Sequence, residues 1–125
     1  MPRSVLVVDD EADLAGLLRA LLEGAGYRVA VAGDGRAALR LLGAGRYDLV
    51  LSDLMMPYLD GAGLAAAMRA DPALRAIPLV LLSAAPGAAA RAAPCAAFLP
   101  KPFDVAQVLA TVARLLGPAP APQQP

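Results

Sequence analysis

Short apolar runs in this sequence lead into polar side chains that could do chemistry together. These side chains are Asp9, Asp10, Asp53, Ser83 and Lys101. Three carboxylates about 5 Å apart repel by roughly 3 kcal/mol per pair at an effective dielectric constant of about 20, so they predict a bound cation. Oxygen-only ligands favour Mg²⁺, while a lysine ammonium and a serine hydroxyl can bind phosphoryl oxygens. The set therefore predicts transfer of a phosphoryl group onto an aspartate.

Each of these residues also has a simpler interpretation. Asp9 and Asp10 precede a predicted helix, and taken alone they favour a capping role. Asp53 could belong to a turn before Pro57, and the Ser83 hydroxyl could simply bond to the backbone. We prefer the site hypothesis because four separate strand ends carry the groups that one reaction needs.

The order of the secondary-structure elements predicts that these side chains meet. Strands are predicted from the short apolar runs at 5–8, 28–32, 49–51, 78–82 and 96–99. Helical patterns lie between them, with Asp34 as one N-cap and Asp104 with Gln107 as a capping box. The fold class is α/β: a three-layer, doubly wound sandwich with a five-stranded parallel sheet in the order 2-1-3-4-5. The weaker second and fifth strands suit the edges, and the strand carboxyl ends meet beside one crevice.

The 125-residue chain has the length of one domain. We expect this domain over residues 1–116, followed by a Pro-rich disordered tail at 117–125. Between the fourth and fifth strands, residues 88–93 contain almost no large apolar side chain. This stretch therefore predicts a shortened fourth helix.

Four motifs occur in a characteristic order: VLVVDDE at 5–11, SDLMMPYLDG at 52–61, LLSA at 81–84 and LPKPF at 99–103. Together they resemble the receiver domain of two-component response regulators, which has a flavodoxin-like fold. The resemblance covers residues 4–116. It implies a role in phosphorelay signal transduction, in which a sensor histidine kinase or phosphotransfer protein phosphorylates the chain. The resulting aspartyl phosphate would switch a surface that binds an unidentified downstream protein.

The resemblance also implies a role for each acidic residue of the site. Asp53 matches the phospho-acceptor of the family. Asp9 and Asp10 match the acidic pair that binds Mg²⁺ together with Asp53. Met55 matches the position whose backbone carbonyl completes the metal shell, so its apolar side chain is compatible with that role.

The remaining matched residues would act on the phosphoryl group and on the switch. Ser83 and Lys101 match the hydroxyl and the ammonium that bind the phosphoryl oxygens. Ser83 and Phe98 match the switch pair, in which the ring moves as the hydroxyl is drawn inward. The resemblance further implies a cis peptide bond between Lys101 and Pro102, a geometry that is plausible before proline.

Composition excludes several other functions. Eleven basic residues balance eleven acidic ones, which argues against direct binding of nucleic acid or of an anionic membrane. With no His and one Cys, the chain has no zinc cluster, no disulfide framework and no His-dependent catalysis. No signal peptide or membrane-spanning run is present, so we expect a cytoplasmic protein. Lys101 is the only lysine, which suggests that its position needs a compact ammonium.

Other interpretations remain open. The resemblance implies a phospho-accepting signalling switch, with only self-catalysed phosphorylation and dephosphorylation, rather than an enzyme. A haloacid-dehalogenase-type phosphohydrolase would need a second aspartate two residues after the nucleophile, and that position is Met55. The main alternative is a receiver-like interaction module that works without phosphorylation. The fourth helix belongs to the face through which the family dimerises. Because this helix is predicted to be short, only a weak homodimer stays open.

Overall fold

The computed structural model describes residues 3–84 and 95–117, in which strands and helices alternate. The strands are β1 (Ser4–Val8), β2 (Arg28–Ala32), β3 (Leu49–Asp53), β4 (Leu79–Ser83) and β5 (Ala97–Pro100). The helices are α1 (Ala12–Gly24), α2 (Gly35–Ala44), α3 (Gly61–Ala70) and α5 (Val105–Leu116). The predicted shortened fourth helix and the predicted tail from residue 118 onward lie outside the described residues.

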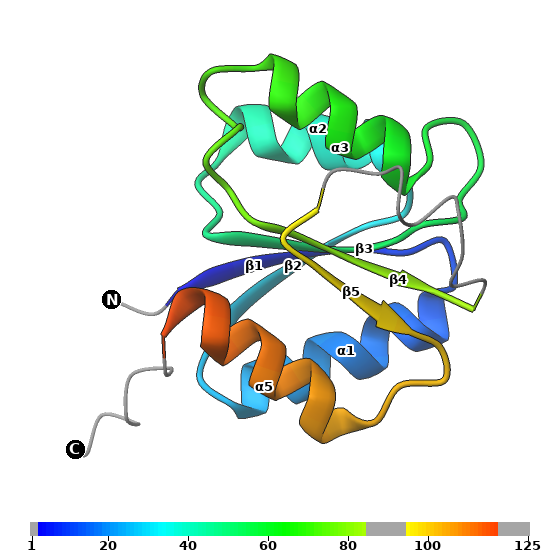
Figure 1. Cartoon of the computed structure of the whole chain (residues 1–125), viewed down its shortest axis with the longest axis vertical. Coiled ribbons are helices and arrows are strands. Elements are labelled where there is room, and N and C mark those ends of the chain that lie inside the picture. Colours follow the sequence, from blue (N-terminus) through cyan, green and yellow to red (C-terminus); the bar gives the residue numbers. More distant parts are fainter. Residues whose placement is uncertain (1–2, 85–94, 118–125) are drawn as a thin grey trace.

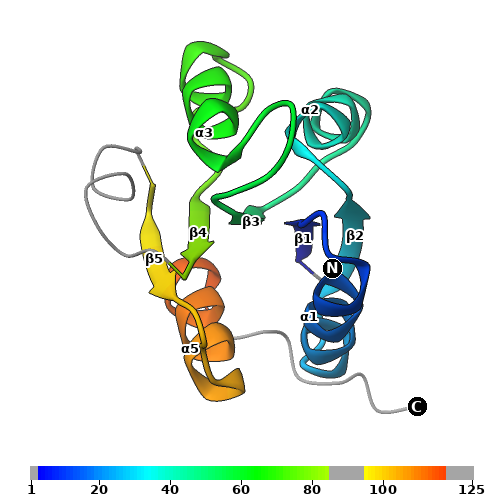
Figure 2. The same ribbon diagram turned by 90° about the vertical axis from the view of Figure 1, so that its right-hand side faces the viewer.

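The strands form one parallel five-stranded sheet in the order β2-β1-β3-β4-β5, which confirms the predicted topology. Helices α2 and α3 cover one face of this sheet, and α1 and α5 cover the other (Figures 1 and 2). Strands β3 and β4 are buried along their whole length, whereas β2 and β5 are partly exposed. The least hydrophobic strands therefore lie at the edges, as their sequences predict.

Side chains in the central strands alternate between two hydrophobic cores. Leu6 and Val8 pack beneath α2 and α3, and Val5 and Val7 pack against α1 and α5. This alternation follows from the two-residue period of a strand, which directs successive side chains to opposite faces. Burial of each such side chain stabilises the fold by about 1.5–3 kcal/mol, so both layers of helices are fixed on the sheet.

Aspartate side chains mark the starts of three helices. Asp34 and Asp60 each accept a hydrogen bond from the backbone N–H three residues further on, at 2.9 and 2.8 Å. Asp104 and Gln107 form a reciprocal capping box at the start of α5. Each cap contributes about 1 kcal/mol. The predicted caps at Asp34 and Asp104 are confirmed, and the cap at Asp60 is an additional finding.

The apolar stripe of α1 is wider than the surface that it buries. Ala15, Leu18 and Leu22 are buried, whereas Leu17 is 52% exposed. Helical spacing alone cannot show how much of a stripe the neighbouring elements cover.

Among residues 3–84 and 95–117, no helix combines the length and the apolar composition that crossing a membrane requires.

Candidate functional site

The register of the sheet brings the polar strand ends to one edge. Val8 of β1 lies opposite Ser52 of β3, and Ser83 of β4 lies opposite Pro100 of β5. The backbone N–H of Lys101 donates to the Ser83 carbonyl at 2.7 Å, which continues the pairing one residue beyond β5. The predicted site residues therefore lie at or next to the ends of neighbouring strands, although they are far apart in the sequence.

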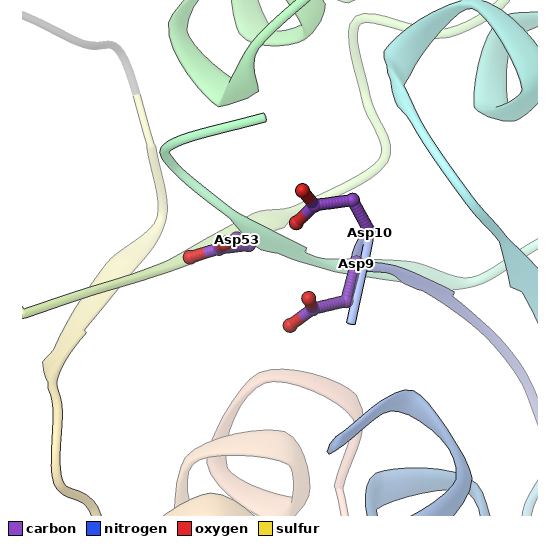
Figure 3. A group of neighbouring side chains, drawn as sticks. All are labelled: Asp9, Asp10 and Asp53. Carbon is purple, nitrogen blue, oxygen red and sulfur yellow. The ribbon is translucent and has the colours of Figure 1, made fainter. Parts of the chain in front are cut away.

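Asp9, Asp10 and Asp53 form an acidic cluster. One carboxylate oxygen from each residue lies within 4.8 Å of the other two. Figure 3 shows Asp9 and Asp10 at the end of β1, beside Asp53 at the end of β3. Asp9 is 2% and Asp53 6% exposed, while Asp10 is exposed to solvent. Because burial weakens solvent screening of the repulsion, this arrangement favours a bound cation.

Asp9 does not cap α1, so the simpler interpretation of this residue is wrong. The N-cap residue is Glu11, and its side chain makes no capping hydrogen bond. Asp9 Oδ1 accepts a hydrogen bond from the Glu11 N–H at 2.9 Å, but Oδ2 is buried and has no hydrogen-bond partner among the described residues. Burial raises the pKa of the Asp9 carboxyl above its ordinary value; the hydrogen bond from Glu11 lowers the pKa, and the Asp53 carboxylate raises it.

These observations fit a hard divalent cation. The three side chains offer only oxygen ligands, and the buried Oδ2 of Asp9, which no other described residue bonds, is an acceptor that a cation would satisfy. Solvent exposure of Asp10 leaves the outer side open to water, as Mg²⁺ requires. Met55 lies in the loop that follows Asp53, and its side chain is 65% exposed.

Lys101 forms an ion pair with Asp53, one of the three aspartates of the cluster. Its Nζ lies 3.1 Å from Asp53 Oδ1, and the two side chains are only 18% and 8% exposed. The Lys101–Pro102 peptide bond is cis. One ammonium and three carboxylates therefore lie close together, and their summed charge is still negative.

Ser83 and Phe98 lie on the neighbouring strands β4 and β5. Ser83 is 1% exposed at the end of β4, and Phe98 is partly buried against the core beneath α2 and α3. Phe98 pairs with Leu81 across β4 and β5, and Ser83 follows Leu81 by two residues on the same strand. Because side chains two residues apart share one face of a strand, Ser83 and Phe98 face the same side of the sheet.

Two residues that support Asp53 were missed in the sequence. The Ser52 hydroxyl is buried and donates to the Asp53 carbonyl at 2.8 Å. A Cβ on Gly61 would lie 2.7 Å from the Asp53 carbonyl oxygen and 2.8 Å from Leu54 Cα, so only glycine fits there. A polar residue inside an otherwise apolar strand was the available signal for Ser52. Nothing in the sequence shows the close approach at Gly61, because it depends on how α3 packs.

Sequence comparisons find close relatives of this chain. A family model described as the response regulator receiver domain matches residues 5–113. The response regulator MprA of Mycolicibacterium vanbaalenii is 38% identical over 120 residues, which cover 93% of this chain and 51% of that protein. The DNA-binding response regulator MtrA of Mycobacterium tuberculosis is 44% identical over 84 residues, or 67% of this chain and 36% of that protein. The chain thus spans about a third to a half of the curated relatives that it matches.

Solved structures share the fold. A signal receiver domain of a signal transduction histidine kinase from Syntrophus aciditrophicus aligns with a TM-score of 0.87 and 32% identity, covering 91% of this chain and 89% of that one. The receiver domain of the sensor histidine kinase PA1611 from Pseudomonas aeruginosa aligns with a TM-score of 0.85 and 30% identity, covering 94% and 99%. That structure has a magnesium ion coordinated in its active-site cleft.

Proposed function

The chain belongs to the response regulator receiver family, and we propose that it accepts a phosphoryl group on Asp53 from a sensor histidine kinase or phosphotransfer protein. One observation carries this proposal: the partly buried Lys101–Asp53 ion pair, at 3.1 Å, lies within an acidic cluster at the strand ends. A receiver domain is a signalling switch, so the proposed chemistry serves regulation rather than turnover.

We assign the metal site to Asp9, Asp10 and Asp53, with the backbone carbonyl of Met55 as a further ligand. The all-oxygen donor set supports Mg²⁺ at this position, as does the buried Oδ2 of Asp9, which has no hydrogen-bond partner in the described part of the chain. When bound, Mg²⁺ supplies positive charge against the carboxylates and the phosphoryl oxygens. The magnesium ion in the PA1611 receiver domain gives independent support from a relative.

In the proposed reaction, a carboxylate oxygen of Asp53 attacks the phosphorus of a phosphohistidine. The new O–P bond forms as the P–N bond breaks, and the electron pair of that bond returns to the ring nitrogen. Because the other ring nitrogen carries a proton, the histidine leaves as neutral imidazole. The Lys101 ammonium exchanges its contact with Asp53 Oδ1 for one with a phosphoryl oxygen, and the Ser83 hydroxyl donates to another. Both groups act by electrostatic stabilisation of charge that spreads over the transferred group.

The proposed switch follows from the position of Ser83 relative to Phe98. Movement of the Ser83 hydroxyl toward a phosphoryl group on Asp53 opens space on the side of the sheet that Phe98 also faces. The Phe98 ring, which is only partly buried, moves into that space and changes the surface next to β5. A local electrostatic event thereby biases the chain between two conformations.

We further propose that this receiver domain contacts protein rather than nucleic acid. Its eleven basic and eleven acidic residues balance, so no strong positive potential is available for a phosphate backbone. MtrA is a DNA-binding response regulator, and this chain matches 36% of its length. The downstream target is therefore assigned only as a protein that distinguishes the two conformations.

Intact mass spectrometry after incubation with acetyl phosphate and Mg²⁺ tests the proposed function. We expect one added phosphoryl group on the wild type and on Asp13→Asn, a control at an exposed acidic residue in the first turn of α1. No addition is expected on Asp53→Asn, or on the wild type in the presence of a chelator. If the wild type takes up no phosphoryl group under conditions that load another receiver domain, the alternative of a phosphorylation-independent interaction module is favoured.

A further inference from the structure

The loop between β3 and α3 contains an unusual backbone conformation. Tyr58 has φ of 67° and is the only non-glycine residue with a positive φ among residues 3–84 and 95–117. Residues with a Cβ rarely adopt this left-handed conformation, and bulky ones do so least of all. Tyr58 is also 77% exposed, so burial of its ring in a core does not hold the conformation.

A cation–π contact with α2 holds the Tyr58 ring instead. The guanidinium carbon of Arg36 lies 4.2 Å from the centroid of this ring. Arg36 is the second residue of α2, where a positive charge interacts unfavourably with the helix dipole. The backbone conformation of Tyr58 and the position of Arg36 in the first turn of α2 are each locally unfavourable. The contact between the two side chains links α2 to the loop.

The loop has anchors besides this contact: the Met56 side chain packs against the core beneath α2 and α3, and two backbone hydrogen bonds hold Leu54 and Leu59. The Gly61 N–H donates to the Leu54 carbonyl at 2.8 Å, which joins the two ends of the loop, and the Gly35 N–H donates to the Leu59 carbonyl near the α3 end at 3.2 Å. A Cβ on Gly35 would clash with that Leu59 carbonyl, so the start of α2 lies directly against the loop. Within the described part of the chain, residues 55–58 make no backbone hydrogen bond.

We propose that Arg36 and Tyr58 are positioning residues that hold the Met55 carbonyl ready for Mg²⁺. This inference rests on the metal site of the proposed function. Met55 lies three residues before Tyr58, in a stretch that forms no backbone–backbone hydrogen bond with any other described residue. A loop that is restrained before the ion arrives loses less conformational entropy on binding, so the contact raises affinity for the metal.

The test measures Mg²⁺ affinity by NMR titration of methionine methyl groups. The chain has four methionines, and Met55→Leu assigns the signal nearest to the proposed ligand. We expect Arg36→Gln and Tyr58→Gly each to weaken Mg²⁺ binding by roughly two- to fivefold, the range of an exposed cation–π contact. Both substitutions remove the same contact. The double variant should therefore bind Mg²⁺ no more weakly than the single variant with the lower Mg²⁺ affinity.

Two controls separate this effect from general changes of charge or ring. Arg40→Gln makes the same charge change at an exposed position of α2 and should bind Mg²⁺ as the wild type does. Tyr58→Phe keeps the ring and should also retain affinity. The unfolding temperature of metal-free Tyr58→Gly should equal or exceed that of the wild type, because glycine adopts the positive φ without strain.

Each outcome decides for or against the proposal. Wild-type affinity in Arg36→Gln and Tyr58→Gly, or additive losses in the double variant, would overturn the positioning role and leave the metal site intact. Weaker affinity in Arg40→Gln to the same extent would overturn it too, since net charge would then explain the loss. Absence of any Mg²⁺-dependent shift in the wild type would overturn both this inference and the proposed metal site.

Discussion

The Lys101 ammonium reaches over the end of β4 to pair with the Asp53 carboxylate. The Nζ–Oδ1 distance is 3.1 Å, and β4 lies between the two strands that carry these residues, β3 and β5. Both side chains are mostly buried, so neither charge is well screened by water. Removal of one partner therefore leaves the other as an unpaired charge in a poorly solvated position.

The first prediction concerns the size of the cation at this position. Lys101→Arg keeps the charge, but its planar guanidinium is larger and directs its N–H groups differently. We expect the rate of phosphorylation by acetyl phosphate to fall by about tenfold, and by on the order of 100-fold in Lys101→Ala, where the charge is lost. Time courses by intact mass measure both rates. Phosphorylation of Lys101→Arg at the wild-type rate would refute the requirement for a compact ammonium.

The second prediction concerns the space beside Asp53. Gly61→Ala places a Cβ against the backbone of Asp53 and Leu54, so we expect a loss of stability and slower phosphorylation. Gly16→Ala is the matched control, because Gly16 lies inside α1 with nothing within 4 Å of its Cβ position. That change should stabilise the fold by about 0.5–1 kcal/mol and leave phosphorylation unchanged. Equal thermal shifts in the two variants would contradict the packing argument.

The third prediction concerns the cost of ionised Asp9 in the metal-free protein. Its carboxyl is buried and Oδ2 has no partner within the described residues, which raises its pKa. Asp9→Asn removes the charge and can still accept the hydrogen bond from Glu11. We expect the unfolding temperature near pH 7 in a chelator to rise by several degrees, as measured by circular dichroism.

The pH dependence of that effect follows from the direction of the pKa shift. Because the pKa of Asp9 is higher in the folded chain than the value of roughly 3.9 in the unfolded chain, the folded state keeps its proton to higher pH. The stabilisation that Asp9 contributes is thus fully present at a pH below its pKa in the unfolded chain. It is lost as the pH rises through its pKa in the folded chain. The gap between Asp9→Asn and the wild type should shrink toward about pH 4. A gap that is constant with pH would exclude ionisation of Asp9 as its cause.

The fourth prediction concerns metal removal. Mg²⁺ at about ten times its dissociation constant should stabilise the wild type by about 1.4 kcal/mol relative to the chelated protein. Asp10→Asn should lose most of this gain, because one ligand of the acidic cluster is gone. Asp13→Asn changes an exposed acid three residues away and should keep the gain. Thermal unfolding with and without Mg²⁺ measures these differences, and an equal loss in both variants would indicate nonspecific screening.

The order of the elements could be predicted because each one leaves a local signature. The buried strands appear as apolar runs, and the caps at Asp34 and Asp104 appear as helix starts. Exposure was harder to predict. Leu17 fits the apolar stripe of α1 but is 52% exposed, because the stripe is wider than the neighbouring elements cover.

The sequence by itself determined the sheet order and which polar residues end the strands, because strand period and parallel connectivity depend on local pattern. The tertiary structure decided how those residues meet. It buries Asp9 Oδ2 with no hydrogen-bond partner among the described residues, pairs Lys101 with Asp53, and brings Arg36 of α2 over the ring of Tyr58. These arrangements depend on how separate strands, helices and loops come together in space, which no local pattern specifies.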